Sequence, residues 1–97
     1  MPEVYFDVTW PDGQTQRCYS PSSTITTYFN GQQTMALQEF LSTAQQGLNH
    51  ASERVLQRYG FACSSAMDQL SRIQQRAQQY SQQADASVTI CCPAVDG

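Results

Sequence analysis

The chain has 97 residues, which is enough for one domain with one hydrophobic core. Its net charge of −3 argues against a nucleic-acid-binding protein, whose affinity depends on neutralising phosphates. No stretch resembles a secretory signal or a membrane span, so we expect a cytoplasmic protein whose cysteines are free thiols.

Residues 1–19 are predicted to form a β-hairpin, because apolar and polar side chains alternate on both sides of a turn. The turn is Pro11-Asp12-Gly13, in which proline presets φ and glycine accepts a positive φ. The register that suits this turn places Phe6 opposite Cys18 on the inner face. The outer-face pairs are Thr9 with Thr15, Asp7 with Arg17, and Tyr5 with Tyr19.

Residues 20–33 are predicted to be a loop with one short helical turn. Ile25, Tyr28 and Phe29 have the i, i+3, i+4 spacing of such a turn, and Asn30-Gly31 ends it.

Residues 34–83 are predicted to form a helical hairpin. Thr34 is expected to cap the first helix, and Gly60 to take the left-handed position after it. Gly47 interrupts this helix, which indicates either close packing against a neighbour or a hinge. The expected apolar stripe consists of Leu37, Phe40, Leu41, Ala44, Leu48, Ala51, Val55 and Tyr59.

The second helix of this hairpin is predicted to begin near Ser65. Ser65 and Asp68 have the spacing of a capping box, and Asp68 with Arg72 has the spacing of an ion pair. The short turn between the helices makes them antiparallel. The expected apolar stripe is Ala66, Leu70, Ile73, Ala77 and Tyr80.

Residues 86–92 are predicted to form a third strand, followed by a frayed tail at 93–97. We expect this strand to lie beside the first strand, which gives the order 2-1-3. The fold class is therefore predicted to be α+β: a two-layer sandwich with the order ββααβ, in which a pair of long helices covers a three-stranded sheet.

Cys63 is a candidate functional thiol, because it lies at the start of the second helix, where the helix dipole favours a thiolate. With Ser64 and Ser65 it could also bind an anionic group on free backbone N–H groups. The alternative is a small buried residue in a turn. His50, predicted to be exposed, lies roughly 15 Å back along the first helix, too far to act as its base.

No catalytic residues, metal site or cofactor are predicted. Cys91 and Cys92 point to opposite faces of a strand, and Cys18 lies two strands away, so they do not match a zinc site. Phosphate-binding and nucleophile motifs are also missing from the sequence.

Four of the five arginines form i, i+4 pairs, Arg54 with Arg58 and Arg72 with Arg76. These pairs indicate either an anion-binding patch or two solvated helix faces whose cations lie near helix C-termini.

The outer face of the predicted sheet is a candidate protein interface, because tyrosine and arginine are favoured there. Tyr5, Arg17 and Tyr19 are the candidate interaction residues, and an exposed sheet edge is a second possible contact. The alternative is an ordinary solvated sheet face. The expected outer-face residues are Tyr5, Asp7, Thr9, Thr15, Arg17, Tyr19, Ser87 and Thr89.

Three motifs, "WPDG" at 10–13, "CYSPSS" at 18–23 and "ASERVLQRYGFACSSAMDQL" at 51–70, together resemble a family of small bacterial proteins named for the nitrogen-starvation response. The resemblance spans residues 2–90. It implies genes clustered with a nitrilase-type enzyme, a radical SAM protein, an acetyltransferase-like protein and a flavoprotein, and a role in scavenging nitrogen from nitriles or cyanide. It implies no catalytic residues and no role for Cys91 or Cys92.

We therefore expect a non-catalytic accessory protein of nitrogen scavenging, which binds another protein of the gene cluster or a second copy of itself as a homodimer. No nucleic acid or membrane partner is expected. The alternative is a small thiol-dependent enzyme or anionic-ligand carrier that uses Cys63. A DNA-binding regulator is disfavoured by the acidic charge and the lack of a basic recognition helix.

Overall fold

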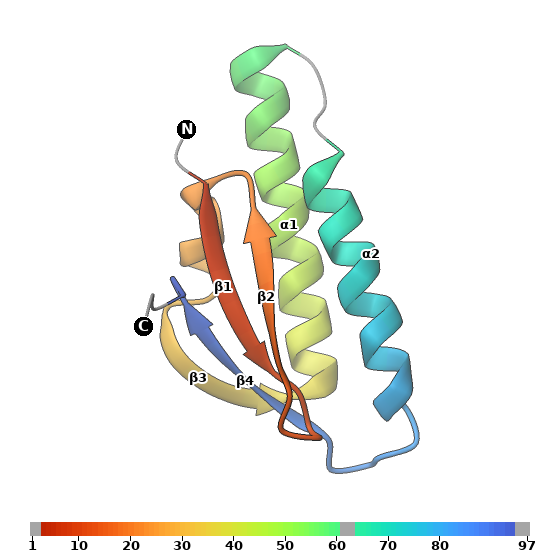
Figure 1. Cartoon of the computed structure of the whole chain (residues 1–97). Helices are drawn as coiled ribbons and strands as arrows, with labels where there is room; N and C mark the ends of the chain where they lie inside the picture. The colour runs from red at the N-terminus through yellow and green to blue at the C-terminus, as the bar shows by residue number, and fades with distance from the viewer. Residues whose placement is uncertain (1–2, 61–63, 95–97) are drawn as a thin grey trace.

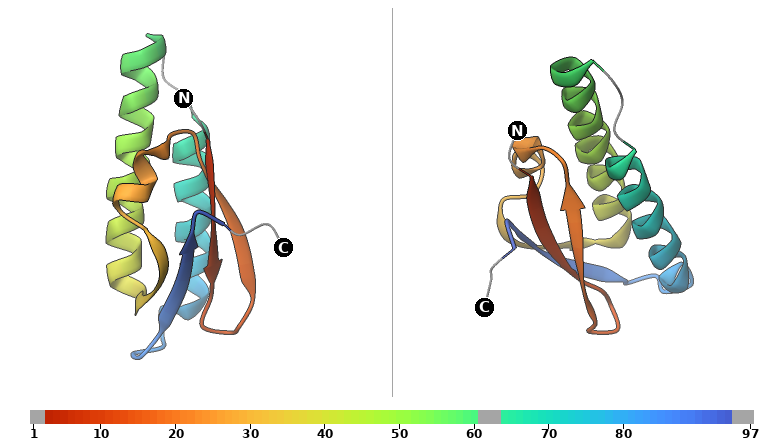
Figure 2. Two further views of the ribbon diagram at one scale, coloured as in Figure 1. Left: turned by 90° about the vertical axis from the view of Figure 1, so that its left-hand side faces the viewer. Right: turned by 45° about the horizontal axis from the view of Figure 1, so that its top comes forward.

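A two-layer α+β arrangement is seen in the computed structural model, which describes residues 3–60 and 64–94 (Figure 1). An antiparallel sheet forms one layer, and a pair of helices packs on one face of it (Figures 1 and 2). The predicted α+β class is thus confirmed. The described elements are β1 (Val4–Thr9), β2 (Thr15–Ser20), η1 (Ser23–Thr27), β3 (Gly31–Ala36), α1 (Leu37–Tyr59), α2 (Ser65–Ala77), η2 (Gln78–Tyr80) and β4 (Ser87–Cys92).

The β1–β2 hairpin has the predicted register. Tyr5 lies opposite Tyr19, and Asp7 opposite Arg17. The turn is closed by the Trp10 N–H, which donates to the Gln14 carbonyl at 2.8 Å, and Gly13 takes a φ of 89°. Because the alternation fixes which side chains point inward, the inner face of the hairpin enters the core.

The sheet contains four strands in the described residues, in the order β2-β1-β4-β3, so the predicted three-stranded sheet and the ββααβ order are wrong. The placement of the last strand beside the first is confirmed, since β4 pairs antiparallel with β1. The missed strand is β3, at the far edge. Its Gln32-Gln33-Thr34 segment has no apolar alternation, and it is a strand because it pairs along its length with β4.

The start of α1 also differs from the prediction. Thr34 lies in β3 opposite Thr89 and does not cap the helix, which begins at Leu37. The cap position belongs to Ala36, whose side chain makes no capping hydrogen bond. Instead, the Leu37 N–H donates to the Ala86 carbonyl at 3.0 Å, which satisfies one of the free N–H groups at this helix end.

The helices α1 and α2 run in opposite directions, and the C-terminal part of α1 extends beyond the ends of the strands (Figure 1). Tyr59 lies on this extension and is 50% exposed, so its assignment to the apolar stripe is wrong. The predicted cap is confirmed, because Gly60 has a φ of 77° and its N–H donates to the Leu56 carbonyl at 2.8 Å. The buried residues of α1 are Leu37, Phe40, Ala44, Gly47, Leu48, Ala51 and Val55.

Gly47 lies where α1 packs against η1. A Cβ atom on this residue would lie 2.7 Å from Cδ1 of Ile25 and 3.2 Å from the ring of Tyr28. The predicted close packing at Gly47 is therefore confirmed. The neighbour that requires it is the short 3-10 helix η1, which lies in the segment where the sequence predicted a helical turn.

Trp10 is the largest buried side chain of the core and packs against two aromatic neighbours. Its indole stacks on Tyr80 with ring centroids 5.7 Å apart and meets Phe40 edge-on at 5.8 Å. Tyr80 reaches this position from η2, a 3-10 turn that continues α2 after Ala77. Among the described residues, no helix combines the length and apolar character needed to cross a membrane.

Candidate functional site

The candidate interaction residues Tyr5, Arg17 and Tyr19 lie together on the outer face of the sheet, the face away from the helices. The rings of Tyr5 and Tyr19 are 5.6 Å apart between centroids, and Tyr5 is 45% exposed. Next to them, Nε of Arg17 donates to Oδ1 of Asp7 at 3.0 Å. The structure thus presents an aromatic pair and an ion pair side by side on one surface.

A row of threonines crosses the same face, one from each strand of the described sheet. Thr9 pairs with Thr15 on one side and with Thr89 on the other, and Thr89 pairs with Thr34. Hydroxyl groups are 3.1 Å apart between Thr9 and Thr15, and 3.0 Å apart between Thr34 and Thr89. Thr34 was not predicted to lie on this face, because the sequence pattern did not indicate the strand β3.

Cys91 joins the outer face beside the ion pair, opposite Asp7, whereas Cys92 points into the core. Burial raises the pKa of Cys92 to about 11 and that of Cys18 to about 12. These two thiols are therefore protonated and poorly nucleophilic at neutral pH. Within residues 3–60 and 64–94, no three His, Cys, Asp or Glu side chains gather closely enough to hold a metal ion.

The second candidate site can be described only in part, because Cys63 lies outside the described residues. Ser64 is exposed, and its carbonyl accepts the Asp68 N–H at 2.8 Å. Ser64 occupies the cap position without a side-chain capping bond, and Ser65 is the first helical residue. The predicted capping box with Ser65 as the cap is therefore wrong.

His50 is exposed, as predicted, but it has a partner that the sequence did not indicate. Its Nδ1 lies 3.2 Å from the Tyr28 hydroxyl, and the two rings meet edge-on at 5.9 Å. This contact ties α1 to the segment after η1.

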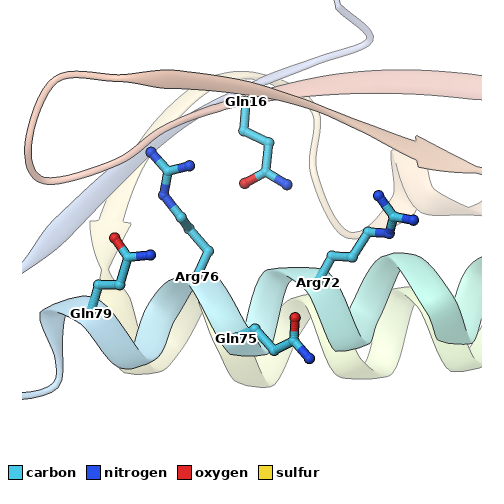
Figure 3. Close-up of a pocket in the computed structure, with 5 residues that line it drawn as sticks. All are labelled: Gln16, Arg72, Gln75, Arg76 and Gln79. Carbon is cyan, nitrogen blue, oxygen red and sulfur yellow. The ribbon is translucent and has the colours of Figure 1, made fainter.

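The two arginine pairs differ in their surroundings. Arg54 and Arg58 border a hollow of about 400 Å³, and its lining residues within the described part of the chain come from the end of α1. Arg72 and Arg76 border a groove of about 280 Å³ between α2 and β2, which we call the α2–β2 groove (Figure 3). Its lining residues are Gln16, Arg72, Gln75, Arg76 and Gln79.

Arg76 is held in place by Gln14 of the hairpin turn and by Tyr80 of η2. One terminal nitrogen donates to Oε1 of Gln14 at 2.6 Å, and its Nε donates to the Tyr80 hydroxyl at 3.4 Å. Its guanidinium also lies 5.9 Å from the ring centroid of Trp10, and the Tyr80 hydroxyl bond raises the pKa of Arg76. A signal for this groove was present in the sequence, because the hairpin register places the polar Gln16 on the inner face.

Comparison with known proteins gives a family match over most of the chain. The model of a family described as nitrogen starvation-induced protein NitG matches residues 5–92. The three motifs singled out in the sequence all lie within this range. No curated protein and no solved structure matches the chain.

Proposed function

The chain belongs to the family of nitrogen starvation-induced protein NitG, and from this premise we propose that it is a non-catalytic accessory protein that binds another protein during nitrogen starvation. The partner is a second protein of a nitrogen-scavenging pathway in the cytoplasm. Use of nitriles or cyanide is the scavenging chemistry that the family resemblance suggests.

The observation that carries this proposal is the composition of the outer sheet face. Tyrosine and arginine contribute strongly to protein interfaces when a partner covers them. Here Tyr5 is 45% exposed and the Arg17 side chain is 47% exposed, next to each other on a face that the helices leave open. The threonine row adds short β-branched side chains that allow close approach of a partner.

The buried thiols also support a binding role over a catalytic one. Cys18 and Cys92 are enclosed in the core, and their pKa values are raised. The alternative thiol-dependent function depends on Cys63, and no observation on the described residues favours it.

The proposal is tested by affinity purification of the tagged protein from nitrogen-starved and nitrogen-replete cells. The test variant carries Tyr5→Thr, Arg17→Thr and Tyr19→Thr, which preserve strand propensity while removing the proposed anchors. The matched control carries three alanines on the exposed side of α1, at Gln45, Asn49 and Glu53. Circular dichroism verifies that each variant is folded.

We expect a partner that is enriched during starvation, retained by the control and lost from the test variant. Sedimentation of the purified protein shows whether that partner is a second copy. A protein that stays monomeric and captures nothing specific, or a partner retained by the test variant, would overturn the proposal.

A further inference from the structure

The α2–β2 groove has walls from two elements that are far apart in the sequence. Gln16 enters from β2, and Arg72 and Arg76 enter from α2 (Figure 3). Among the described residues, the lining side chains are arginines and glutamines, so each can donate hydrogen bonds, and none of them carries a negative charge. This composition is suited to a small anion.

The orientation of Gln16 is fixed by the core beneath it. The Trp10 indole N–H donates to Oε1 of Gln16 at 3.0 Å. Because an indole N–H can only donate, the carboxamide oxygen must face Trp10, and the Nε2 amino group must face the other way. Figure 3 shows that this amino group lies on the side of Arg72. A donor from the strand and a guanidinium from the helix therefore face the same space.

Each of the two arginines has a carboxylate partner with which a ligand must compete. Arg72 pairs with Asp68 at 3.0 Å, with the two side chains 68% and 62% exposed. Such exposed pairs contribute only about 0–1 kcal/mol, so an incoming anion can compete for Arg72. Arg76 pairs with Asp12 at the longer distance of 4.0 Å, while Gln14 and Tyr80 hold its side chain in place.

We propose that the α2–β2 groove binds a small anion, with a carboxylate or phosphate group held between Arg72 and the amino group of Gln16, while Arg76, on the carbonyl side of Gln16, adds positive charge (Figure 3). Guanidinium groups suit both anions because their parallel N–H groups match two oxygens. The volume of about 280 Å³ leaves space for a carboxylate or phosphate group.

This site is independent of the proposed protein interface. The groove lies between the inner face of β2 and α2, whereas Tyr5, Arg17 and Tyr19 lie on the outer face. The test therefore uses the purified protein alone, and its result does not depend on whether a protein partner exists.

The test is a titration of the purified protein with succinate, inorganic phosphate and the uncharged analogue succinamide, at constant ionic strength. Trp10 is the single tryptophan of the chain and contacts both Gln16 and Arg76, so its fluorescence reports on the groove. The NMR signals of the arginine Nε–H groups provide a second measurement.

Three variants locate the site. Arg72→Gln removes one guanidinium and should weaken anion binding at least about tenfold. Gln16→Glu keeps an oxygen acceptor for Trp10 but places a negative charge in the groove, and it should abolish binding. Arg54→Gln is the matched control, because Arg54 belongs to the other i, i+4 arginine pair and should leave binding unchanged.

A saturable change with succinate or with phosphate, absent with succinamide, supports the proposal and identifies the preferred group. The proposal is overturned if neither anion saturates the signal. It is equally overturned if Arg54→Gln weakens binding as much as Arg72→Gln does, since the effect would then be one of general charge.

Discussion

At Gly47, α1 approaches η1 so closely that a side chain has no room. The atoms that a Cβ would meet belong to Ile25, which is fully buried, and to the ring of Tyr28. Because Ile25 is enclosed in the core, its Cδ1 has to shift against other buried side chains to make room. The glycine therefore costs helix propensity but permits the contact between these two elements.

We expect Gly47→Ala to lower the free energy of unfolding by about 1 kcal/mol. Alanine gains about 1 kcal/mol in helix propensity, but overpacking typically costs about 1–3 kcal/mol. Urea denaturation measures the difference. Gln45→Ala, at an exposed position of the same helix, should change the stability by less than about 0.5 kcal/mol. An increase in stability for Gly47→Ala would contradict this account.

Gln69 is a polar residue whose side chain is buried between α2 and the sheet. It lies in α2, a helix whose other glutamines are exposed, yet it is only 9% exposed. Its Oε1 accepts the backbone N–H of Tyr19 at 3.0 Å, which joins α2 to the edge strand β2.

Replacing Gln69 with methionine keeps the length of the side chain and removes the acceptor. We expect a loss of about 1–2 kcal/mol in the free energy of unfolding, because the Tyr19 N–H is left without this bond. Gln75→Met, on the exposed side of the same helix, is the control. Equal stability of the two variants would show that water replaces the lost bond without cost.

Among the elements, the β1–β2 hairpin illustrates what local sequence can determine. Its turn residues, its alternation and its cross-strand pairs lie within twenty residues and all agree on one register. The edge strand β3 is the opposite case. Its polar residues fit a helix or a loop equally well, and only pairing with β4, more than fifty residues away, makes it a strand.

We expect a favourable coupling of about 0.5 kcal/mol between Asp7 and Arg17 across this hairpin. Two N–H groups of Arg17 donate to the carboxylate, at 3.0 and 3.3 Å, but both side chains are partly exposed. A double-mutant cycle with Asp7→Thr and Arg17→Thr measures the coupling by urea denaturation. The coupling should decrease as salt is added, and its absence at low salt would contradict the prediction.

The two candidate sites were predictable to different degrees, because one is built from neighbouring residues of the chain and the other from distant ones. Tyr5, Arg17 and Tyr19 follow from the hairpin register, so the sequence placed them together on the outer face. For the α2–β2 groove, the hairpin register places Gln16 on the inner face, but it does not show which helix, more than fifty residues later, packs beside this residue. The arginine spacing alone did not distinguish Arg72 and Arg76 from Arg54 and Arg58.

For the whole molecule, the buried thiols predict a loss of stability at high pH. Burial raises the pKa of Cys18 to about 12 and of Cys92 to about 11, from a value of 9.0 in the unfolded chain. The unfolded state therefore releases these protons first. The stability that the two protonated, buried thiols contribute is fully present below pH 9 and is lost as the pH rises through about 11 to 12.

Thermal unfolding measured from pH 8 to pH 11 tests this prediction. The double variant Cys18→Ala, Cys92→Ala should be less stable near neutral pH but should lose less stability as the pH rises. An equal decline in the variant and the parent protein would assign the loss to other groups, such as tyrosines.

The position of β4 between β1 and β3 also determines when the molecule can be completed during its synthesis. A ribosome makes the chain from its N-terminus at about 5–20 residues per second. Until β4 has been synthesised, β3 lacks the strand with which it pairs, and the edge of β1 that will pair with β4 stays open. Until residue 92 leaves the exit tunnel, a nascent chain would thus leave unpaired the two strand edges that β4 later covers, a period in which chaperones can act on it.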